Sequence, residues 1–210
     1  MGIRCELVTW EHFYQLAREL AWRVRKASFN PEVIVAIGRG GYMPARILSD
    51  YLDILDLACI KVEHYHGAHK DRSAQVRHPL VADIAGKRVL LVDDVSDTGD
   101  TFQVAIDHLR KRGEPAELKS AVLHHKRISD YVPDYFSAEV VEWRWIIYPW
   151  AVIEDLSSFL HALDPLPATT EAFAGRLLEQ HGITVRRQIL QDVLELSGGK
   201  DRPERAVRPG

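Results

Sequence analysis

The segment that most constrains the fold of this chain is an apolar run, Val89–Val92, that leads directly into acidic residues. Four consecutive aliphatic residues are typical of a strand buried on both faces. Three aspartates follow within Asp93–Asp97, and the chain then passes through Thr98–Thr101 into a stretch with helical spacing. We therefore predict a buried strand, a polar turn over 93–100 and a helix over 101–112 that begins beside three carboxylates.

Short apolar runs alternate with helical patterns along most of the chain. We expect strands at 33–37, 58–63, 89–92, 118–123 and within 140–148, and helices at 10–27, 44–52, 101–112 and 153–163. This alternation predicts an α/β fold with a mainly parallel central sheet flanked by helices. The stretch 64–79 is polar and lacks periodicity, so we predict a long loop there, of the kind that often serves as a lid. Parallel sheets bind ligands beyond the carboxyl ends of their strands, where both the 93–101 turn and the glycines at 38–41 fall.

The character of the sequence changes after residue 163. Pro165 and Pro167 indicate a linker, and two short amphipathic helices are expected at 171–180 and 185–196. The last stretch is rich in Gly, Pro and Arg, which is typical of a frayed terminus. We therefore predict a main domain over 1–163 that includes a small hood, a helical C-terminal extension over 164–197 and a disordered tail over 198–210.

Composition limits the classes of function. Of the 210 residues 46% are hydrophobic, which is enough for one well-buried core, and the formal net charge of −3 argues against a nucleic-acid-binding surface. The two cysteines, Cys5 and Cys59, form no metal-binding pattern and fit a reducing cytosol. No apolar stretch of about 18 residues occurs, so we expect no membrane span. We expect a cytoplasmic protein without a membrane partner.

The acidic turn has the groups needed to hold a sugar phosphate. Its backbone N–H groups, together with the dipole of the helix that follows, would form a site for a phosphate dianion. Thr98 and Thr101 can add hydroxyl donors, and Gly99 permits close approach and a positive φ angle. Asp93 and Asp94 can accept hydrogen bonds from a sugar diol, directly or through a hydrated Mg²⁺ ion.

The sequence Asp-Asp-x-x-Asp-Thr-Gly-x-Thr after four apolar residues resembles the phosphoribosyl-diphosphate signature of the type I phosphoribosyltransferases. The resemblance implies that Asp93 and Asp94 hold the ribose hydroxyls and Mg²⁺, with Asp94 as the metal ligand. It further implies that Asp97 acts beside the base nitrogen as a general base and that 97–101 holds the 5′-phosphate. The alternative is a solvent-exposed turn that is acidic by chance, but three crowded carboxylates repel one another and would serve a purely structural turn poorly.

One position departs from the family pattern. Asp100 stands where many members carry a second small residue, and it places an extra negative charge in the phosphate-binding turn. Its side chain either points outward or caps the helix that follows. Asp100 is therefore kept among the expected phosphoribosyl-diphosphate contacts, although it weakens the expected geometry.

Ile37–Gly41 resembles the diphosphate loop of the same family, with Arg39 and Gly40 as the expected contacts. A guanidinium can bind a diphosphate bidentately, and in this family the loop often carries a non-proline cis peptide, here involving Arg39. The polar stretch 64–79 corresponds in position to the family's mobile flap. Its neighbourhood offers four candidate diphosphate contacts, each of which is equally well explained as a surface charge: Lys61, Lys70, Arg72 and Arg77.

A third segment concerns the base. In purine-specific members a lysine at the position of Lys126 donates to the oxygen at purine C6, and an aromatic at the position of Trp145 stacks on the ring. The spacing from Trp145 to Trp150 resembles bacterial xanthine–guanine enzymes, and backbone groups at Ile146 are expected to contact the base edge. We interpret Trp143 and Trp150 as core residues. A lysine facing C6 disfavours adenine, which carries an amine there.

The resemblance implies a Mg²⁺-dependent purine phosphoribosyltransferase of purine salvage, usually a homodimer or homotetramer in this family. It would transfer the 5-phosphoribosyl group from phosphoribosyl diphosphate to a 6-oxopurine, with hypoxanthine, guanine and xanthine left open. One alternative is a regulator of the same fold that senses phosphoribosyl diphosphate or a nucleotide, possible because of the basic C-terminal stretch. Another is a diphosphokinase-like subunit, against which Lys126 and Trp145 argue.

Overall fold

The computed structural model describes residues 2–66 and 72–198 of the chain. Within these ranges the chain forms two compact units. One spans Tyr14–Glu142, and the other combines the residues up to Phe13 with those from Trp143 onward. None of the described helices is long and apolar enough to cross a lipid bilayer.

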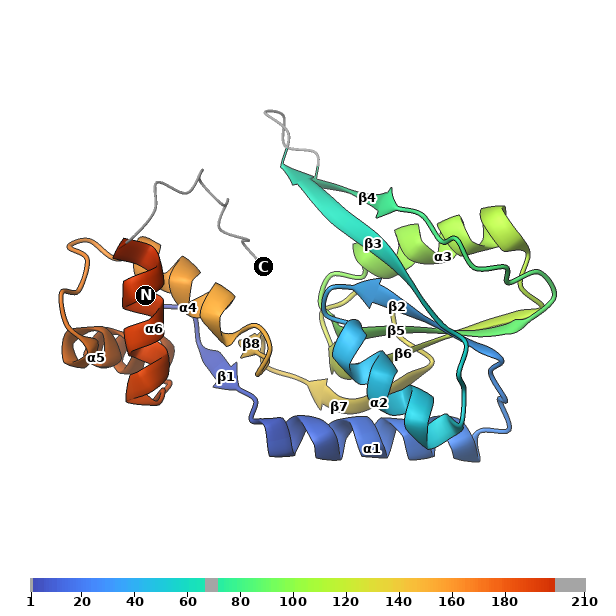
Figure 1. Cartoon of the computed structure of the whole chain (residues 1–210), viewed down its shortest axis with the longest axis horizontal. Coiled ribbons are helices and arrows are strands. Elements are labelled where there is room, and N and C mark those ends of the chain that lie inside the picture. Colours follow the sequence, from blue (N-terminus) through green and yellow to red (C-terminus); the bar gives the residue numbers. More distant parts are fainter. Residues whose placement is uncertain (1, 67–71, 199–210) are drawn as a thin grey trace. The chain divides into compact units, whose positions relative to one another are not determined.

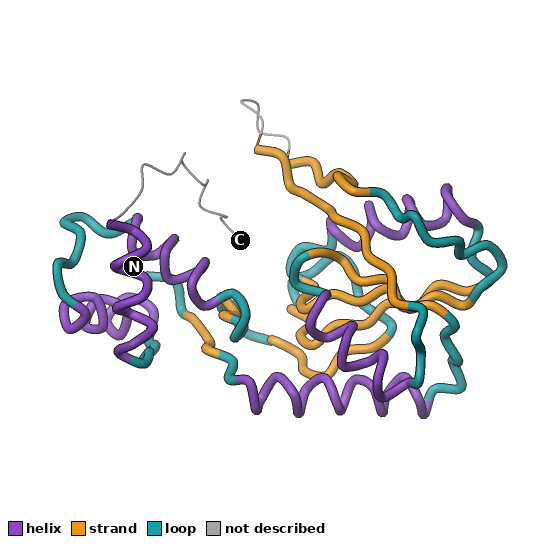
Figure 2. The backbone as a smooth tube through the Cα atoms, viewed as in Figure 1, coloured by secondary structure: helices purple, strands orange, loops and turns teal. Residues whose placement is uncertain are grey.

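The Tyr14–Glu142 unit is built on a central sheet (Figures 1 and 2). Its described strands are β2 (Val33–Gly38), β3 (Leu57–His66), β4 (Arg72–His78), β5 (Arg88–Ser96), β6 (Glu117–Lys126) and β7 (Tyr135–Val140), in the order β4-β3-β2-β5-β6-β7. All neighbouring pairs are parallel except β3 with β4. The predicted α/β fold with a mainly parallel sheet is thus confirmed.

Helices cover both faces of this sheet. Figure 1 shows α3 (Asp100–Gly113) on one side and α2 (Tyr42–Leu52), together with α1 (Trp10–Lys26), on the other. The α3 side is an apolar cluster in which Val35 and Leu91 of the strands meet Phe102 and Leu109 of the helix. Successive strand residues point to opposite faces, so the unbroken apolar runs of β2 and β5 place apolar side chains on both faces of the sheet.

The acidic turn is shorter than predicted. The strand was expected to end at Val92, but β5 continues to Ser96 because its parallel pairing with β6 extends as far as Ser96 and His125. Asp93 and Asp94 are therefore strand residues rather than turn residues. Backbone pairing with an adjacent strand fixes the end of a strand as much as side-chain polarity does, and the sequence pattern reports only polarity.

The predicted long loop over 64–79 is wrong for its described part. β3 runs on to His66 and pairs antiparallel with β4, with Val62 opposite Val76. β4 is at the edge of the sheet, where polar side chains are common because one side faces solvent. The polar residues that indicated a loop therefore belong to a hairpin at the edge of the sheet. Residues 67–71, including the candidate Lys70, lie outside the described residues.

The second unit contains a small parallel pair and three helices. β1 (Cys5–Leu7) pairs with β8 (Trp145–Ile147), and the chain continues into α4 (Val152–His161), α5 (Thr170–His181) and α6 (Arg187–Gly198). The predicted apolar segment within 140–148 is split, because 141–144 separate β7 from β8. β1 was not predicted, since three residues carry too little periodicity to be recognised.

The helices of this unit share one core. Leu156 of α4, Phe173 and Leu177 of α5, and Val193 of α6 are each at most 1% exposed and pack around Ile147. α5 ends at Gly182, whose φ of 71° places it in the left-handed region that favours glycine. The predicted boundary at 163/164 falls inside this shared core, whereas the compact units divide after Phe13 and after Glu142.

Candidate active site

The site lies where three adjacent parallel strands end. β5 is paired with β2 on one side and with β6 on the other, so the carboxyl ends of all three parallel strands lie at the same end of the sheet. The glycine turn 38–41 follows β2, the acidic turn 97–99 follows β5, and Lys126 is the last residue of β6. Open α/β sheets bind ligands at such an edge.

Asp93 and Asp94 follow the apolar run of β5, where the continuous burial of Val89–Asp93 gives way to the half-buried Asp94. Asp93 is buried, and one of its carboxylate oxygens accepts a hydrogen bond from the backbone N–H of Asp94 at 2.9 Å. The side chain of Asp94 points toward the preceding turn: a Cβ added at Gly40 would overlap its carboxylate group. The structure therefore brings the second aspartate and the glycine turn into direct contact.

The glycine turn is shaped by close backbone approach. The peptide bond between Gly38 and Arg39 is cis, as the family resemblance implied. The N–H of Gly41 donates to the carbonyl of Ile37 at 2.9 Å, and a Cβ at Gly41 would overlap the carbonyl oxygen of Val92 and crowd that of Ile37 at 2.7 Å. Arg39 is exposed at the surface of the turn. The turn thus presents backbone and one guanidinium, as a diphosphate site would require.

The acidic turn leads directly into α3. Gly99 has a φ of 100° and precedes the first residue of the helix, Asp100. The Thr98 hydroxyl donates to the Asp100 carboxylate at 3.0 Å. A carboxylate in the first turn of a helix is favoured by the helix dipole. The Thr98 hydroxyl, which was expected to donate to the phosphate, therefore donates to Asp100 instead.

An ion pair joins the acidic turn to β6. The Lys126 Nζ lies 2.8 Å from the Asp97 Oδ2, and the lysine side chain is only 3% exposed, compared with 26% for the aspartate. Burial lowers the pKa of Lys126 below its usual value, although the hydrogen bond and the charge of Asp97 act in the opposite direction. The predicted catalytic acid and the predicted base-binding lysine are thus direct neighbours.

The other base-contact candidates lie in the second unit. Trp145 and Ile146 belong to β8, where they pair with Cys5 and Glu6 of β1. Ile146 is buried and Trp145 is half-buried. Trp150 packs edge-on against Phe13 at 4.8 Å between ring centroids, consistent with its interpretation as a packing residue. Roles for Trp145 and Ile146 at the base stay predictions.

The flap candidates also stay predictions. Lys61 forms an ion pair with Glu63 of the same strand, with 2.5 Å between the Nζ and the Oε1. The charge of Lys61, through this hydrogen bond, lowers the pKa of Glu63. Arg77 is exposed on β4.

Sequence reasoning missed the residues that support the acidic turn. Ser96, Ser129 and Tyr131 surround it and are joined by hydrogen bonds. Ser96 occupies one of the variable positions of the signature, and the other two follow Lys126 in the segment between β6 and β7. Short polar residues in a connecting segment give no periodic signal, so only the pairing of β5 with β6 reveals them.

The carboxylates fit Mg²⁺ that arrives with its substrate. Within the described ranges no group of three or more His, Cys, Asp or Glu side chains is arranged to hold a metal ion. Mg²⁺ is usually held by one or two carboxylates together with substrate phosphates. Asp93 and Asp94 supply hard oxygen donors at the strand edge, and this donor set matches that mode of binding.

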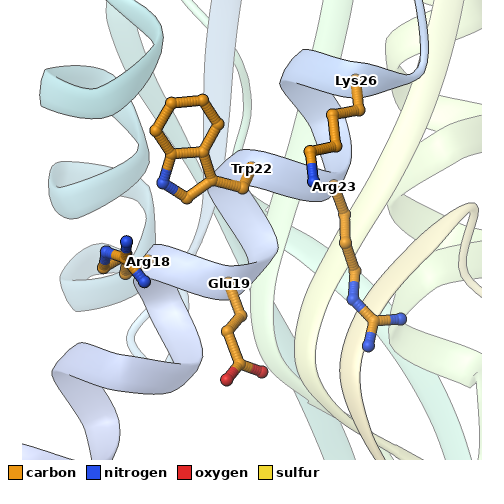
Figure 3. Close-up of a pocket in the computed structure, with 5 residues that line it drawn as sticks. All are labelled: Arg18, Glu19, Trp22, Arg23 and Lys26. Carbon is orange, nitrogen blue, oxygen red and sulfur yellow. The ribbon is translucent and has the colours of Figure 1, made fainter.

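A separate hollow lies on the surface of α1. It has a volume of about 550 Å³ and is lined by side chains of that helix alone, namely Arg18, Glu19, Trp22, Arg23 and Lys26 (Figure 3). Arg23 donates to the carbonyl oxygen of Ser137 at 3.2 Å, which ties the helix to β7. None of the predicted site residues borders this hollow, so the strand edge is the candidate active site.

Comparisons with known proteins agree with this geometry. The model of the phosphoribosyl transferase domain matches residues 5–154. The chain is 31% identical over 159 residues to the xanthine-guanine phosphoribosyltransferase of Idiomarina loihiensis, covering 76% of this chain and 91% of that protein. The corresponding enzyme of Nitratidesulfovibrio vulgaris is 31% identical over 144 residues, covering 68% and 82%. A purine phosphoribosyltransferase structure from Pyrococcus horikoshii superposes with a TM-score of 0.63 at 36% identity, covering 70% and 94%.

Proposed function

The chain belongs to the phosphoribosyl transferase family, and from this premise we propose which reaction it catalyses. The proposed enzyme transfers the 5-phosphoribosyl group of phosphoribosyl diphosphate to a ring nitrogen of a 6-oxopurine, with Mg²⁺. The products are a nucleoside monophosphate and diphosphate, which places the enzyme in purine salvage. The observation that carries the proposal is the buried Lys126 held against Asp97 at the start of the acidic turn.

The Lys126–Asp97 pair is complementary to one edge of a 6-oxopurine. A buried ammonium is a donor to the carbonyl oxygen at C6, and an adjacent carboxylate is an acceptor for the N–H of the neighbouring ring nitrogen. Adenine would place an amine, itself a donor, against the ammonium and would leave a buried cation poorly paired. The pair therefore favours hypoxanthine, guanine and xanthine over adenine.

The remaining groups fit the sugar donor. In the proposed complex the backbone amides of 97–101 bind the 5′-phosphate at the start of α3. Asp93 and Asp94 accept hydrogen bonds from the ribose hydroxyls. The glycine turn with Arg39 binds the diphosphate, whose negative charge the guanidinium offsets as it leaves. In this assignment the acidic turn binds the 5′-phosphate and the glycine turn binds the diphosphate of the same substrate.

The proposed reaction is a displacement at ribose C1′ with an oxocarbenium-like transition state. The carboxylates of β5 and the acidic turn favour the developing positive charge of the sugar. Asp97 accepts the proton of the ring N–H that it contacts, while another nitrogen of the base forms its bond to C1′ and the bond from C1′ to diphosphate breaks. Bound Mg²⁺ would supply additional neutralisation of the diphosphate charge. Because the groups are fixed on strand ends, the collision of base and sugar becomes a positioned step.

The relatives support the class of base. Those from Idiomarina loihiensis and Nitratidesulfovibrio vulgaris are xanthine-guanine phosphoribosyltransferases. The regulator alternative rested on basic residues near the C-terminus, of which Arg187 pairs with Glu171 at 3.1 Å and those beyond 198 lie outside the described residues. We also propose that the protein is cytoplasmic and that it forms a homodimer or homotetramer. Sedimentation of the purified protein would test the oligomeric state.

The test is a transfer assay with a panel of bases. The purified protein is incubated with phosphoribosyl diphosphate, Mg²⁺ and hypoxanthine, guanine, xanthine or adenine, and both products are measured. We expect nucleotide and diphosphate in equal amounts from 6-oxopurines, little from adenine, and loss of both products with EDTA. Tight binding of phosphoribosyl diphosphate without transfer to any base would contradict the proposal and favour the regulator.

Asp97→Asn in the same assay tests the assignment of the general base. An amide cannot accept the purine proton, so turnover is expected to fall by about 10²–10³-fold. The variant also leaves the buried Lys126 without its carboxylate partner, so its unfolding temperature is measured in parallel. Unchanged turnover in a folded variant would exclude Asp97 from this role.

A further inference from the structure

The segment that joins β6 to β7, residues 127–134, lies along the acidic turn. Three of its consecutive residues each contact a residue of the β5 end or of the turn. Ser129 meets Ser96, Asp130 meets Thr98, and Tyr131 meets Gly99. This arrangement is independent of the Asp97–Lys126 ion pair.

The first contact is a buried triangle of hydrogen bonds. The hydroxyls of Ser96 and Ser129 lie 2.8 Å apart, and each lies 3.0 Å from the carbonyl oxygen of Tyr131. Ser96 is 1% exposed and Ser129 is 8% exposed. Each hydroxyl has one proton, so one serine donates to the carbonyl while the other donates to the first serine. Ser96 immediately precedes Asp97, and the triangle therefore fixes the start of the turn.

The next two contacts fix the rest of the turn. The backbone N–H of Asp130 donates to the carbonyl of Thr98 at 3.0 Å. A Cβ at Gly99 would lie 2.7 Å from the Cβ and 2.8 Å from the backbone nitrogen of Tyr131, so the two backbones are in close contact. The backbone of the turn is thereby held at Thr98 and Gly99, directly before the first helical residue, Asp100.

The supporting segment is itself anchored to β6 and to α3. At its start the N–H of Ser129 donates to the carbonyl of Lys126 at 2.9 Å, which ties it to the end of β6. Further along, the Tyr131 ring stacks on Phe102 of α3, with 5.0 Å between centroids and 9° between planes. Its phenol donates to the Ser120 hydroxyl at 2.7 Å.

We infer that Ser129, acting with Ser96, is a positioning residue that holds the 97–101 turn in its phosphate-binding conformation. The inference rests on the proposed function, since it assigns to that turn the 5′-phosphate of the substrate. A turn that is ordered before binding loses less conformational entropy when the phosphate arrives, and its amides are already aimed. Neither serine touches the substrate; both act through the backbone of the turn.

The chain offers a matched control in the same segment. Tyr131→Phe likewise removes one hydroxyl from the segment, but this part-buried hydroxyl bonds to Ser120 rather than to the β5 end. The ring and its stacking on Phe102 are retained. A purely structural role for the segment predicts similar behaviour of Tyr131→Phe and Ser129→Ala, whereas a positioning role separates them.

The experiment compares wild type, Ser96→Ala, Ser129→Ala, the double variant and Tyr131→Phe. Steady-state kinetics give kcat and KM for phosphoribosyl diphosphate at saturating base, and titration calorimetry gives the affinity for ribose 5-phosphate. We expect Ser129→Ala to raise KM about tenfold and to weaken ribose 5-phosphate binding equally, with kcat changed less than about threefold. Tyr131→Phe should leave KM within about twofold of wild type. The double variant should resemble the worse single variant, because both serines act through one contact.

The outcomes separate the two claims. Transfer by wild type with an unchanged KM in Ser129→Ala would overturn the positioning role while leaving the proposed function intact. Equal rises of KM in Ser129→Ala and Tyr131→Phe would also overturn it, because general loosening of the segment would then explain both. Absence of transfer and of ribose 5-phosphate binding by folded wild type would overturn the proposed function and the inference together.

Discussion

The two turns at the carboxyl ends of the strands, 38–41 after β2 and 97–99 after β5, are built in different ways. The glycine turn is held by backbone hydrogen bonds, such as that from Gly41 to Ile37, and by the absence of side chains at positions where a Cβ would overlap its neighbours. The acidic turn is held by buried serine hydroxyls and by a segment from the next connection. The glycine turn thus depends on the absence of side chains, and the acidic turn depends on side-chain hydrogen bonds.

This difference matches the groups that the turns are proposed to bind. A diphosphate that leaves needs close backbone approach and one exposed guanidinium, which the glycine turn provides. A 5′-phosphate that stays through the reaction needs fixed amides, which the supporting segment of the acidic turn provides. The two constructions therefore respond to mutation differently.

The largest expected effect is on stability, from Gly41→Ala. Its new Cβ would meet the backbone of Val92 and Ile37, which cannot move as a flexible side chain can. We expect a loss of about 3 kcal/mol in the free energy of unfolding, measured by urea denaturation. Gly175→Ala in α5 is the control: nothing lies within 4 Å of its Cβ, and the change should stabilise by up to about 1 kcal/mol. A neutral Gly41→Ala would refute the spatial account of this turn.

A smaller loss is expected from Gly99→Ala in the acidic turn. The φ of 100° strains any residue with a Cβ, and the Tyr131 backbone lies in the way. We expect about 2 kcal/mol of destabilisation and a KM for phosphoribosyl diphosphate raised about tenfold. Gly182→Ala, with a φ of 71° and open space around it, isolates the strain alone. If both variants lose the same stability, the contact with Tyr131 contributes nothing.

The pH dependence of transfer tests the Lys126 ammonium, whose lowered pKa results mainly from burial. The charged form binds the C6 oxygen, so kcat/KM for guanine should fall as pH rises through this pKa, at a lower pH than for an ordinary lysine. The decline should be about tenfold per pH unit above it. Lys126→Arg stays charged throughout and should lose this alkaline limb. An unaltered limb in the variant would assign it to another group.

The smallest expected effect is a gain, from Asp100→Asn. The Asp100 carboxylate accepts from the Thr98 hydroxyl and adds a negative charge where the 5′-phosphate is proposed to bind. Removing that exposed charge should lower KM for phosphoribosyl diphosphate about twofold to threefold, a difference that shrinks as salt is added. A higher KM would mean that Asp100 supports the turn rather than opposing the phosphate.

The sequence predicted the sheet and the position of the site because its strongest signals are local. The apolar runs of β2 and β5 indicate two buried strands, and the glycines after the first run and the aspartates after the second indicate where a ligand could bind. The cis peptide at Arg39 followed from the family resemblance. The pairing of Lys126 with Asp97 was not predicted, because it depends on β6 lying beside β5.

Features that depend on pairing between distant segments were out of reach. The β3–β4 hairpin was taken for a loop because its polar edge lacks periodicity, and β1 is too short to recognise. Ser129 gave no signal, since a serine in a connecting segment is meaningful only once its contact with Ser96 is known. Local polarity thus predicted a set of candidate site residues but not the residues that hold them in place.

The central claim is that the two turns bind opposite ends of one substrate. A crystal structure of the protein with phosphoribosyl diphosphate and Mg²⁺, without base, tests it most directly. The account predicts the 5′-phosphate on the amides of 97–101 and the diphosphate against 38–41 and Arg39. A sugar bound in the reverse direction, or a phosphate bound away from the 97–101 amides, would contradict it.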